Sequence, residues 1–85
     1  MIPIHELLNR IRWDEEYSKA NFVIGYYDRV TDKIIRVSFK ELYFDPEDHF
    51  DFSLVDEEGE AHTIPLHRIR EVSRNGERVW ERHVE

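Results

Sequence analysis

The 85-residue chain contains no cysteine and no glutamine, and it has only three glycines and three prolines. The lack of cysteine excludes disulfide bonds, thiolate metal ligands and cysteine nucleophiles. No glycine-rich phosphate loop is present, which excludes the nucleotide-binding folds that depend on one. A shortage of amide side chains is typical of thermophile proteins, in which ion-pairing residues replace them. Any metal site would therefore have to use histidine and carboxylate ligands.

Long hydrophobic runs are also missing. No apolar run approaches the roughly 18 residues that span a bilayer, and residues 1–13 lack the pattern of a signal peptide. We therefore expect a cytoplasmic protein without membrane contact. Apolar residues make up 40% of the chain, which is enough for it to fold. The length predicts a single domain over residues 1–85.

The negative charge of the chain is unevenly placed. The formal net charge is −7, but residues 41–60 hold nine acidic residues and no basic one, so the other 65 residues carry a net charge of +2. The simpler interpretation is a solvated acidic loop region. The sharper one is an acidic lobe that repels nucleic acid from one side of the molecule and leaves the other side to bind it.

The N-terminal segment predicts an amphipathic helix that lies on a sheet, with Pro3 at its first position. The apolar residues recur with helical spacing and form one stripe, made of Ile4, Leu7, Leu8 and Ile11. A polar stripe of His5, Asn9 and Arg12 follows the same spacing. We interpret this polar stripe as solvated rather than as facing a ligand.

A short helical turn should follow the first helix. Asp14 is a suitable N-cap, and Glu15 and Glu16 are acids that favour the first turn of a helix. We expect this turn to end near Asn21. We also expect Trp13 to join the two helical pieces to the core.

Residues 22–29 and 34–39 alternate between the two faces of a predicted hairpin, with the turn at residues 30–33. Pairing Arg29 with Ile34 gives the hairpin two distinct faces. The core face then holds Ile24, Tyr26, Asp28, Ile35, Val37 and Phe39. The opposite face holds Val23, Gly25, Tyr27, Arg29, Arg36 and Ser38. This opposite face has the composition of a stacking and phosphate-contacting surface, and it is equally consistent with an ordinary solvent face. Asp28 needs a hydrogen-bond donor at the edge of the core face.

A second hairpin is predicted around a loop at residues 57–59. Phe50 and Phe52 alternate toward the core, and the glycine of the loop suits the left-handed conformation. This register opposes Phe52 to Ile64. The position of His62 then favours a hydrogen-bonded residue in the wall of the hairpin over a ligand-binding residue.

The dipeptide Asn75-Gly76 predicts a third hairpin with a type I′ turn. Its register would give three cross-strand pairs, which are Arg74 with Glu77, Val72 with Val79, and Arg70 with Glu81. His67 and Arg68 precede this hairpin and have no such partners in the sequence. Arginine presents a planar fork of donors that matches phosphate or carboxylate, and histidine donates or accepts near neutral pH. These two residues are therefore the better candidates for an anion site.

Together these elements predict an α+β fold with an N-terminal helix packed on a curled antiparallel sheet or small barrel of about six strands. The helical and strand periods point one set of apolar side chains inward. We expect a single core cluster that contains Leu7, Ile11, Ile24, Val37 and Phe52.

Four segments in order, LLNRIRWD, VIGYYDR, IPLHRI and NGERVWER, resemble the small uncharacterised archaeal proteins grouped as the RNA cyclic-group end-recognition domain. The resemblance runs from about Ile4 to Arg82. It implies a β-rich RNA-binding module that also occurs fused to RNA-processing domains and recognises RNA with a terminal 2′,3′-cyclic phosphate. The positions that it carries over are Tyr26, Asp28, Arg29, His67, Arg68, Trp80 and Arg82.

Catalysis has weaker support in the sequence. A two-histidine phosphodiesterase needs two His-x-Ser/Thr motifs, and none of the five histidines begins one. A metal hydrolase could combine His62, His67 and Asp28, but their spacing matches no recognised ligand geometry. No serine has an adjacent histidine or lysine that would activate it.

We therefore predict a binding module without cofactor or metal that recognises a phosphate-bearing RNA end. Arg29, Arg68 and Arg82 would contact phosphate, and His67 would hydrogen-bond a terminal oxygen. Tyr26, Tyr27 or Trp80 would offer a stacking surface, with Asp28 beside them. RNA-processing proteins are candidate partners, and the oligomeric state is left open. A protein-interaction adaptor with acidic and aromatic surfaces is the second interpretation, and a weak phosphoesterase is the third.

Overall fold

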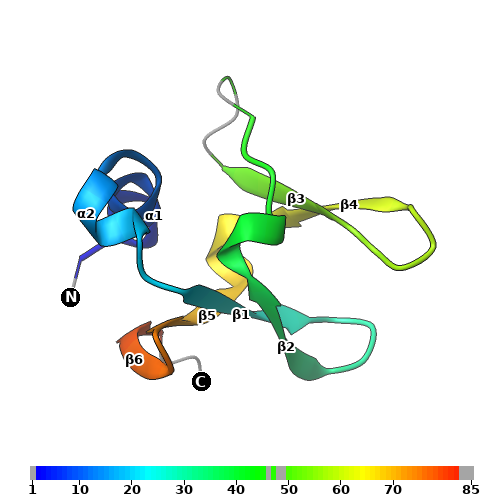
Figure 1. Ribbon diagram of the computed structural model, residues 1–85. Helices are drawn as coiled ribbons and strands as arrows, with labels where there is room; N and C mark the ends of the chain where they lie inside the picture. The colour runs from blue at the N-terminus through cyan, green and yellow to red at the C-terminus, as the bar shows by residue number, and fades with distance from the viewer. Residues whose placement is uncertain (1, 46, 48–49, 83–85) are drawn as a thin grey trace.

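The computed structural model describes residues 2–45, 47 and 50–82. Within these residues two helices come first, and six antiparallel strands and two 3₁₀ turns follow (Figure 1). The helical elements are α1 (Ile4–Trp13), α2 (Glu15–Ser18), η1 (Phe39–Glu41) and η2 (Leu66–Arg68). The strands are β1 (Phe22–Asp28), β2 (Lys33–Ser38), β3 (Asp51–Val55), β4 (Ala61–Pro65), β5 (Ile69–Arg74) and β6 (Glu77–Glu81). No helix in the described part of the chain is long and apolar enough to cross a membrane.

The predicted α+β class and the six strands are confirmed, but the strands divide into two sheets. Four strands form one sheet in the order β2-β1-β5-β6, and β3 and β4 form a second sheet of two strands. A single bridge between Tyr43 and Ser53 extends the smaller sheet. Over the described residues no closed barrel forms, and the β3–β4 hairpin projects away from the larger sheet (Figure 1).

The core lies where α1 and the two sheets meet. The four apolar residues of the α1 stripe are all buried, in one cluster with residues from both sheets. The predicted core is confirmed, because Leu7, Ile11, Ile24 and Phe52 are buried in this cluster and Val37 packs against it. Burying this apolar surface is what holds the helix and the two sheets together.

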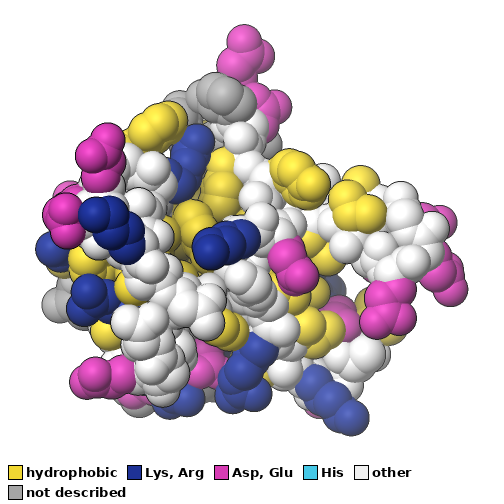
Figure 2. Space-filling view, viewed as in Figure 1, with side chains coloured by type: hydrophobic (Ala, Val, Ile, Leu, Met, Phe, Trp, Pro, Cys, Tyr) yellow, Lys and Arg dark blue, Asp and Glu magenta, His cyan; other side chains and the backbone are white. Residues whose placement is uncertain are grey.

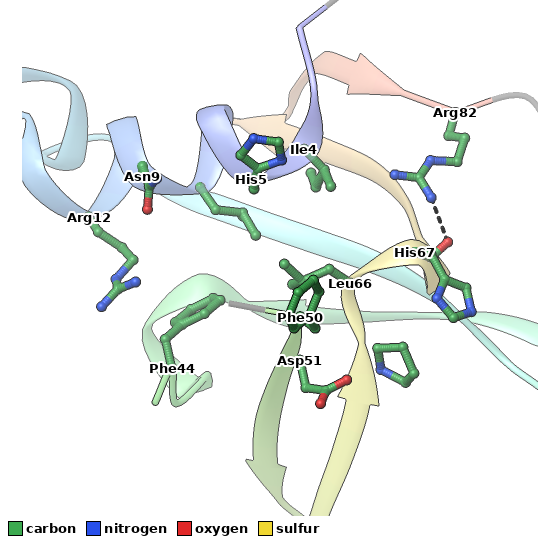
Figure 3. Close-up of a pocket in the computed structure, with 12 residues that line it drawn as sticks. Ile4, His5, Asn9, Arg12, Phe44, Phe50, Asp51, Leu66, His67 and Arg82 are labelled. Carbon is green, nitrogen blue, oxygen red and sulfur yellow. Dashed lines mark hydrogen bonds between the residues drawn. The ribbon is translucent and has the colours of Figure 1, made fainter. Parts of the chain in front are cut away.

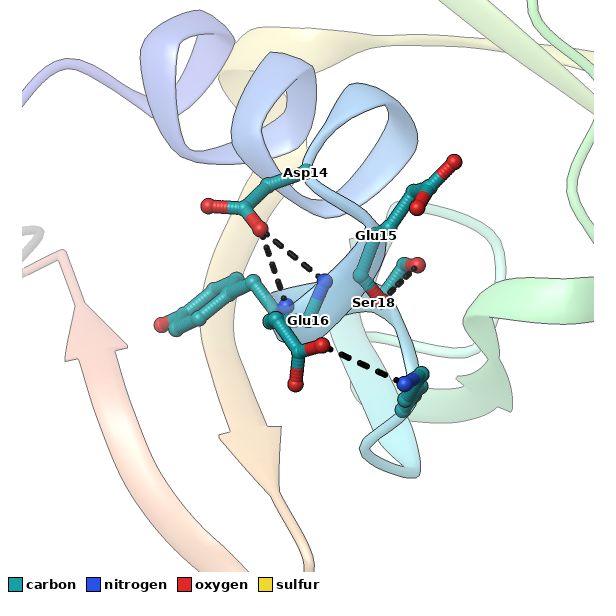
Figure 4. Close-up of polar contacts among 6 residues, drawn as sticks. Asp14, Glu15, Glu16 and Ser18 are labelled. Atoms are coloured by element: carbon teal, nitrogen blue, oxygen red, sulfur yellow. Dashed lines mark hydrogen bonds and ion pairs between the residues drawn. The ribbon is translucent and has the colours of Figure 1, made fainter.

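The break between the two helices is set by Asp14, as predicted. Its carboxylate accepts hydrogen bonds from the backbone N–H groups of Glu16 and Tyr17, each at 3.1 Å (Figure 4). The α2 helix then ends at Ser18, before the predicted end near Asn21. The prediction for Trp13 is wrong, because its side chain is 74% exposed. Trp13 lies off the buried stripe of α1, so its ring faces away from the core.

The β1–β2 hairpin has the predicted faces in a different register. Asp28 pairs with Lys33, so the strands are shifted by two residues from the predicted pairing of Arg29 with Ile34. The Asp28 carboxylate accepts hydrogen bonds from the Val30 N–H and the Thr31 hydroxyl, which closes the turn earlier in the chain. A shift of two residues leaves each side chain on its predicted face. The expectation that Asp28 has a donor is confirmed.

The β5–β6 hairpin begins in the predicted register and then departs from it. Arg74 pairs with Glu77, but the register shifts between Val72 and Ser73, so that Val72 faces Trp80 instead of Val79. Such a bulge turns the following side chains to the other face. Trp80 is therefore buried and Val79 exposed. The bulge also prevents the predicted pairing of Arg70 with Glu81, which stands opposite Glu71.

The β3–β4 hairpin has the predicted register, with Phe52 opposite Ile64. Gly59 in its loop has a φ of +85°, the left-handed conformation that was expected. The inward assignment of Phe50 is wrong, because its side chain is 79% exposed. The strand begins only at Asp51, and the Phe50 carbonyl accepts a hydrogen bond from the Leu66 N–H.

Glu71 covers the face of β1 whose composition is consistent with a phosphate-contacting surface. Its buried carboxylate forms ion pairs with Arg36 at 2.8 Å and with Arg78 at 2.9 Å. A Cβ atom added at Gly25 would lie 2.5 Å from the Cγ atom of Glu71. Gly25 is thus required for close packing, and the Arg36 charge is already paired.

We expect Gly25→Ala to lower the free energy of unfolding by about 1 to 3 kcal/mol, because the new methyl group overpacks against Glu71. In a Glu71→Ala background the same substitution should cost much less, since the obstructing side chain is gone. Urea denaturation of the wild type, both single variants and the double variant measures this coupling. Equal costs of Gly25→Ala in the two backgrounds would contradict the contact.

Candidate functional site

A cleft of about 780 Å³ lies between α1 on one side and the start of β3 with η2 on the other. Five residues of α1 line it, together with Phe44, Phe50 and Asp51, the segment Pro65–His67, and Arg82. The volume is in the range typical of small-molecule sites. Figure 3 shows His5, Asn9 and Arg12 along the helix, with His67 and Arg82 at the far end of the cleft.

The floor of the cleft is apolar and its rim is polar. Ile4 and Leu8 are buried residues of the α1 stripe, and Leu66 packs against the same core. Phe44 and the exposed Phe50 ring supply aromatic surface between the two ends (Figure 3). An apolar floor with a few polar groups around it is the usual composition of a ligand site.

The carbonyl of His67 organises one end of the cleft. It accepts hydrogen bonds from the guanidinium groups of Arg70 and Arg82, each at 2.7 Å. The Arg82 guanidinium also lies 5.3 Å from the centroid of the Trp80 ring. A guanidinium has five N–H donors, so most donors of Arg82 are not used by this bond. Arg82 is thus held in place with donors left for an anion.

Arg12 stands at the other end of the cleft. Its guanidinium lies 5.0 Å from the Trp13 ring centroid and 5.1 Å from that of Phe44. Contacts with two ring faces hold the charge in position without neutralising it. Among the described residues that line the cleft, Asp51 carries the only carboxylate. The cleft therefore has two fixed cationic groups and favours an anionic ligand.

The residues predicted from the first strand are not in this cleft. Tyr26 is 8% exposed and packs edge-to-face on Phe52 at 5.9 Å, so burial raises the pKa of its phenol. The Tyr27 hydroxyl donates to Asp32, and this hydrogen bond raises the Tyr27 pKa. Asp28 closes its own turn. Arg29 is exposed in the same turn.

The later predicted residues lie closer to the cleft. His67 and Arg82 line it and are joined through the His67 carbonyl. Trp80 supports Arg82 from the core, and its indole N–H donates to the Ile2 carbonyl at 2.9 Å. Arg68 lies half-buried in η2 and does not line the cleft. The structure therefore brings together two of the predicted ligand residues, with a third behind them.

Several residues of the cleft were missed in the sequence. The sequence predicts a solvated polar stripe of His5, Asn9 and Arg12. His5 and Asn9 are exposed, and all three residues also line one wall of the cleft. Phe44 gave no signal, and Phe50 was assigned to the core. The polar stripe was the usable signal, because it runs beside the buried stripe on the same helix.

The tip of the β3–β4 hairpin holds a second group of polar side chains. Ligand atoms of Asp56, Glu60 and His62 lie within 4.8 Å of one another. The hydrogen bond of 2.7 Å between His62 and Asp56 raises the pKa of His62 and lowers that of Asp56. Asp56 also accepts the N–H groups of Glu58 and Glu60, so it closes the loop. His62 is thus a hydrogen-bonded residue, as expected.

Acidic side chains gather on this hairpin tip and on the loop before β3 (Figure 2). The cleft itself has arginine at both ends and aromatic surface between them. Such an arrangement can hold a phosphate in charge-assisted hydrogen bonds and a planar base against a ring.

Comparison with known proteins agrees with the resemblance seen in the sequence motifs. The model of the MJ1316 RNA cyclic group end recognition domain matches residues 1–82. Among the curated proteins and the solved structures, none matches the chain. Because the match covers nearly all of the chain, this protein belongs to the family of the MJ1316 RNA cyclic group end recognition domain.

Proposed function

We propose that the cleft binds the 3′-terminal nucleotide of an RNA that ends in a phosphate, and that it does so without catalysing a reaction. The observation that carries the proposal is the pairing of two positioned arginines with an aromatic, apolar floor in one cleft. The family is named for a cyclic group at an RNA end. A 2′,3′-cyclic phosphate is the cyclic group that the 2′-hydroxyl of RNA allows.

The two ends of the cleft support different parts of this ligand. Arg82 and His67 would hold the phosphate, because Arg82 is fixed by Trp80 and by the His67 carbonyl. A donor that is already ordered loses little entropy on binding. Phe50 would stack on the base, since a large exposed ring in a cleft gains by being covered. The roles that the sequence assigns to Arg29 and Arg68 stay predictions.

The acidic lobe limits how the RNA can lie. Residues 41–60 carry nine acidic residues, and a field of that sign repels a polyanion. A long basic track is therefore not expected, and recognition of an end fits better than binding along a strand. A cytoplasmic location and association with RNA-processing proteins belong to the same proposal.

The protein should bind a cyclic-phosphate or linear-phosphate end roughly 10- to 100-fold more tightly than a hydroxyl end, because a hydroxyl leaves charged donors unpaired. Competition titration of short RNAs that differ only at the 3′ end, at two salt concentrations, measures this preference. Added salt should weaken binding with a slope that reports only a few phosphate contacts.

Three outcomes would contradict the proposal. Equal affinity for all three ends would exclude end recognition, and no binding at any salt concentration would favour the protein-interaction adaptor. The RNA recovered from the titration should also keep its cyclic phosphate. Hydrolysis that disappears in His67→Ala would show that the site is catalytic.

A further inference from the structure

We infer that a second groove, next to the cleft, stacks the nucleotides that precede the terminal one, so that the protein selects single-stranded RNA ends. This inference rests on the proposed function and adds a substrate class to it. The groove has a volume of about 500 Å³. The helices α1 and α2 line one side of it, and η1 and the residues after η1 line the other. It shares Arg12 and Phe44 with the cleft.

The exposed aromatic rings are the first observation. Within the described part of the chain three aromatic side chains are mostly exposed, namely Trp13 at 74%, Tyr43 at 64% and Phe50 at 79%. Trp13 and Tyr43 line the second groove, and Phe50 lines the cleft. Exposed apolar side chains are common when they are scattered singly, but exposed rings that gather along one surface are typical of a binding site. Rings in sequence along a surface are how proteins bind successive bases.

Charge is the second observation. Arg12 and Lys40 line the second groove, and among its described lining residues none is acidic, although the chain has nineteen acidic residues. Figure 2 shows hydrophobic surface in the hollow between the helices and η1, with basic side chains beside it. An apolar floor with cations fits the bases and phosphates of a single strand.

Arg12 connects the two grooves. Its guanidinium lies over both Trp13 in the second groove and Phe44 in the cleft, at 5.0 and 5.1 Å. A strand with its terminal base on Phe50 would pass this guanidinium at the next phosphate. The preceding base would then reach Trp13 and Tyr43. Bases paired in a duplex cannot stack in this way, which is why the end must be single-stranded.

The test compares uridine oligonucleotides of one, two, three and six nucleotides, each with a 2′,3′-cyclic phosphate. Affinity should rise roughly 5- to 100-fold from one to three nucleotides, as stacking on one or two rings predicts, and then level off. Trp13→Ala and Tyr43→Ala should each remove much of this gain. Tyr43→Ala should also leave the affinity of the mononucleotide unchanged, because Tyr43 does not line the cleft. Both side chains are exposed, and the hydrogen bonds between Tyr43 and Ser53 use only backbone atoms, so the fold should be retained.

Phe50→Ala is the matched control. It should weaken all lengths equally and keep the gain with length, because it acts on the terminal nucleotide. Fluorescence gives an independent readout, since Trp13 is exposed and Trp80 is buried. The trinucleotide should quench emission more than the mononucleotide does, and Trp13→Phe should abolish the difference. A hairpin RNA with a blunt cyclic-phosphate end should bind no more tightly than the mononucleotide.

The outcomes separate this inference from the proposed function. A preference for phosphate ends without any dependence on length would overturn the stacking groove and leave the proposed function standing. If affinity rises with RNA length through Trp13 but the protein shows no preference for a phosphate end, the proposed function is wrong and the stacking groove stands. A blunt hairpin that binds as tightly as the trinucleotide would exclude selection of single strands.

Discussion

Replacing Phe52 by alanine should lower the free energy of unfolding by about 3 to 5 kcal/mol. The Phe52 side chain is 1% exposed, and its ring lies 5.9 Å from that of Tyr26 and 6.3 Å from that of Phe44. Among the described residues no strand ladder joins β3 or β4 to the larger sheet, and the bridge from Ser53 reaches only Tyr43. Side-chain packing therefore does most to attach this hairpin to the larger sheet. A small domain has only about 5 to 15 kcal/mol of stability, so the variant should be partly or wholly unfolded.

Phe50→Ala provides a control two residues away. The same ring is removed from a side chain that is 79% exposed, so the change in stability should stay within about 0.5 kcal/mol. Chemical denaturation of the two variants beside the wild type measures the difference. If Phe52→Ala unfolds at the same denaturant concentration as the wild type, the inward position of Phe52 is wrong.

The parts of the fold that could be predicted depend on local periodicity. The α1 stripe is a helical pattern over a few turns, and it predicts the buried face of the helix without reference to the strands that pack on it. The β3–β4 register follows from one loop, in which Gly59 takes the left-handed conformation. Both signals lie within a short stretch of chain, so neither depends on knowing a distant contact.

The errors arose where a distant or irregular contact decides the geometry. Phe50 has the right spacing to point inward with Phe52, but its backbone bonds to Leu66 and the strand begins after it. In the last hairpin a bulge exchanges Val79 for Trp80 on the buried face. A larger residue thereby fills the core, and alternation alone could not indicate this.

The candidate site was only partly visible in the sequence, because five separate segments build the cleft. His67 and Arg82 were found through their residue types and the family motifs, and they meet in space. Arg12 and Phe44 come from α1 and from the loop after η1, and only tertiary packing brings them together. When a helix borders a groove, a polar stripe beside its buried stripe therefore indicates residues that line the groove.

Replacing both Arg12 and Arg82 by alanine should cause the largest loss of RNA binding. Each arginine would contribute charge-assisted hydrogen bonds of about 1.5 to 3 kcal/mol. We expect roughly a 10-fold or greater loss of affinity for each single variant and a 100-fold or greater loss for the double variant. Arg12 and Arg82 lie at opposite ends of the cleft (Figure 3), so their effects should be nearly additive.

Arg74→Ala is the charge-matched control for this experiment. Arg74 lies over the Tyr17 ring at 5.1 Å, outside the cleft, so removing it should change affinity little apart from a weak effect of net charge. The fold should survive Arg82→Ala, because Arg70 still donates to the His67 carbonyl, and thermal unfolding checks this. The titration uses RNAs with phosphate and hydroxyl ends. A double variant that keeps the full preference for a phosphate end would show that the phosphate binds elsewhere. The sequence predicts that Arg29 and Arg68 contact phosphate, so these two residues would then be the ones to replace.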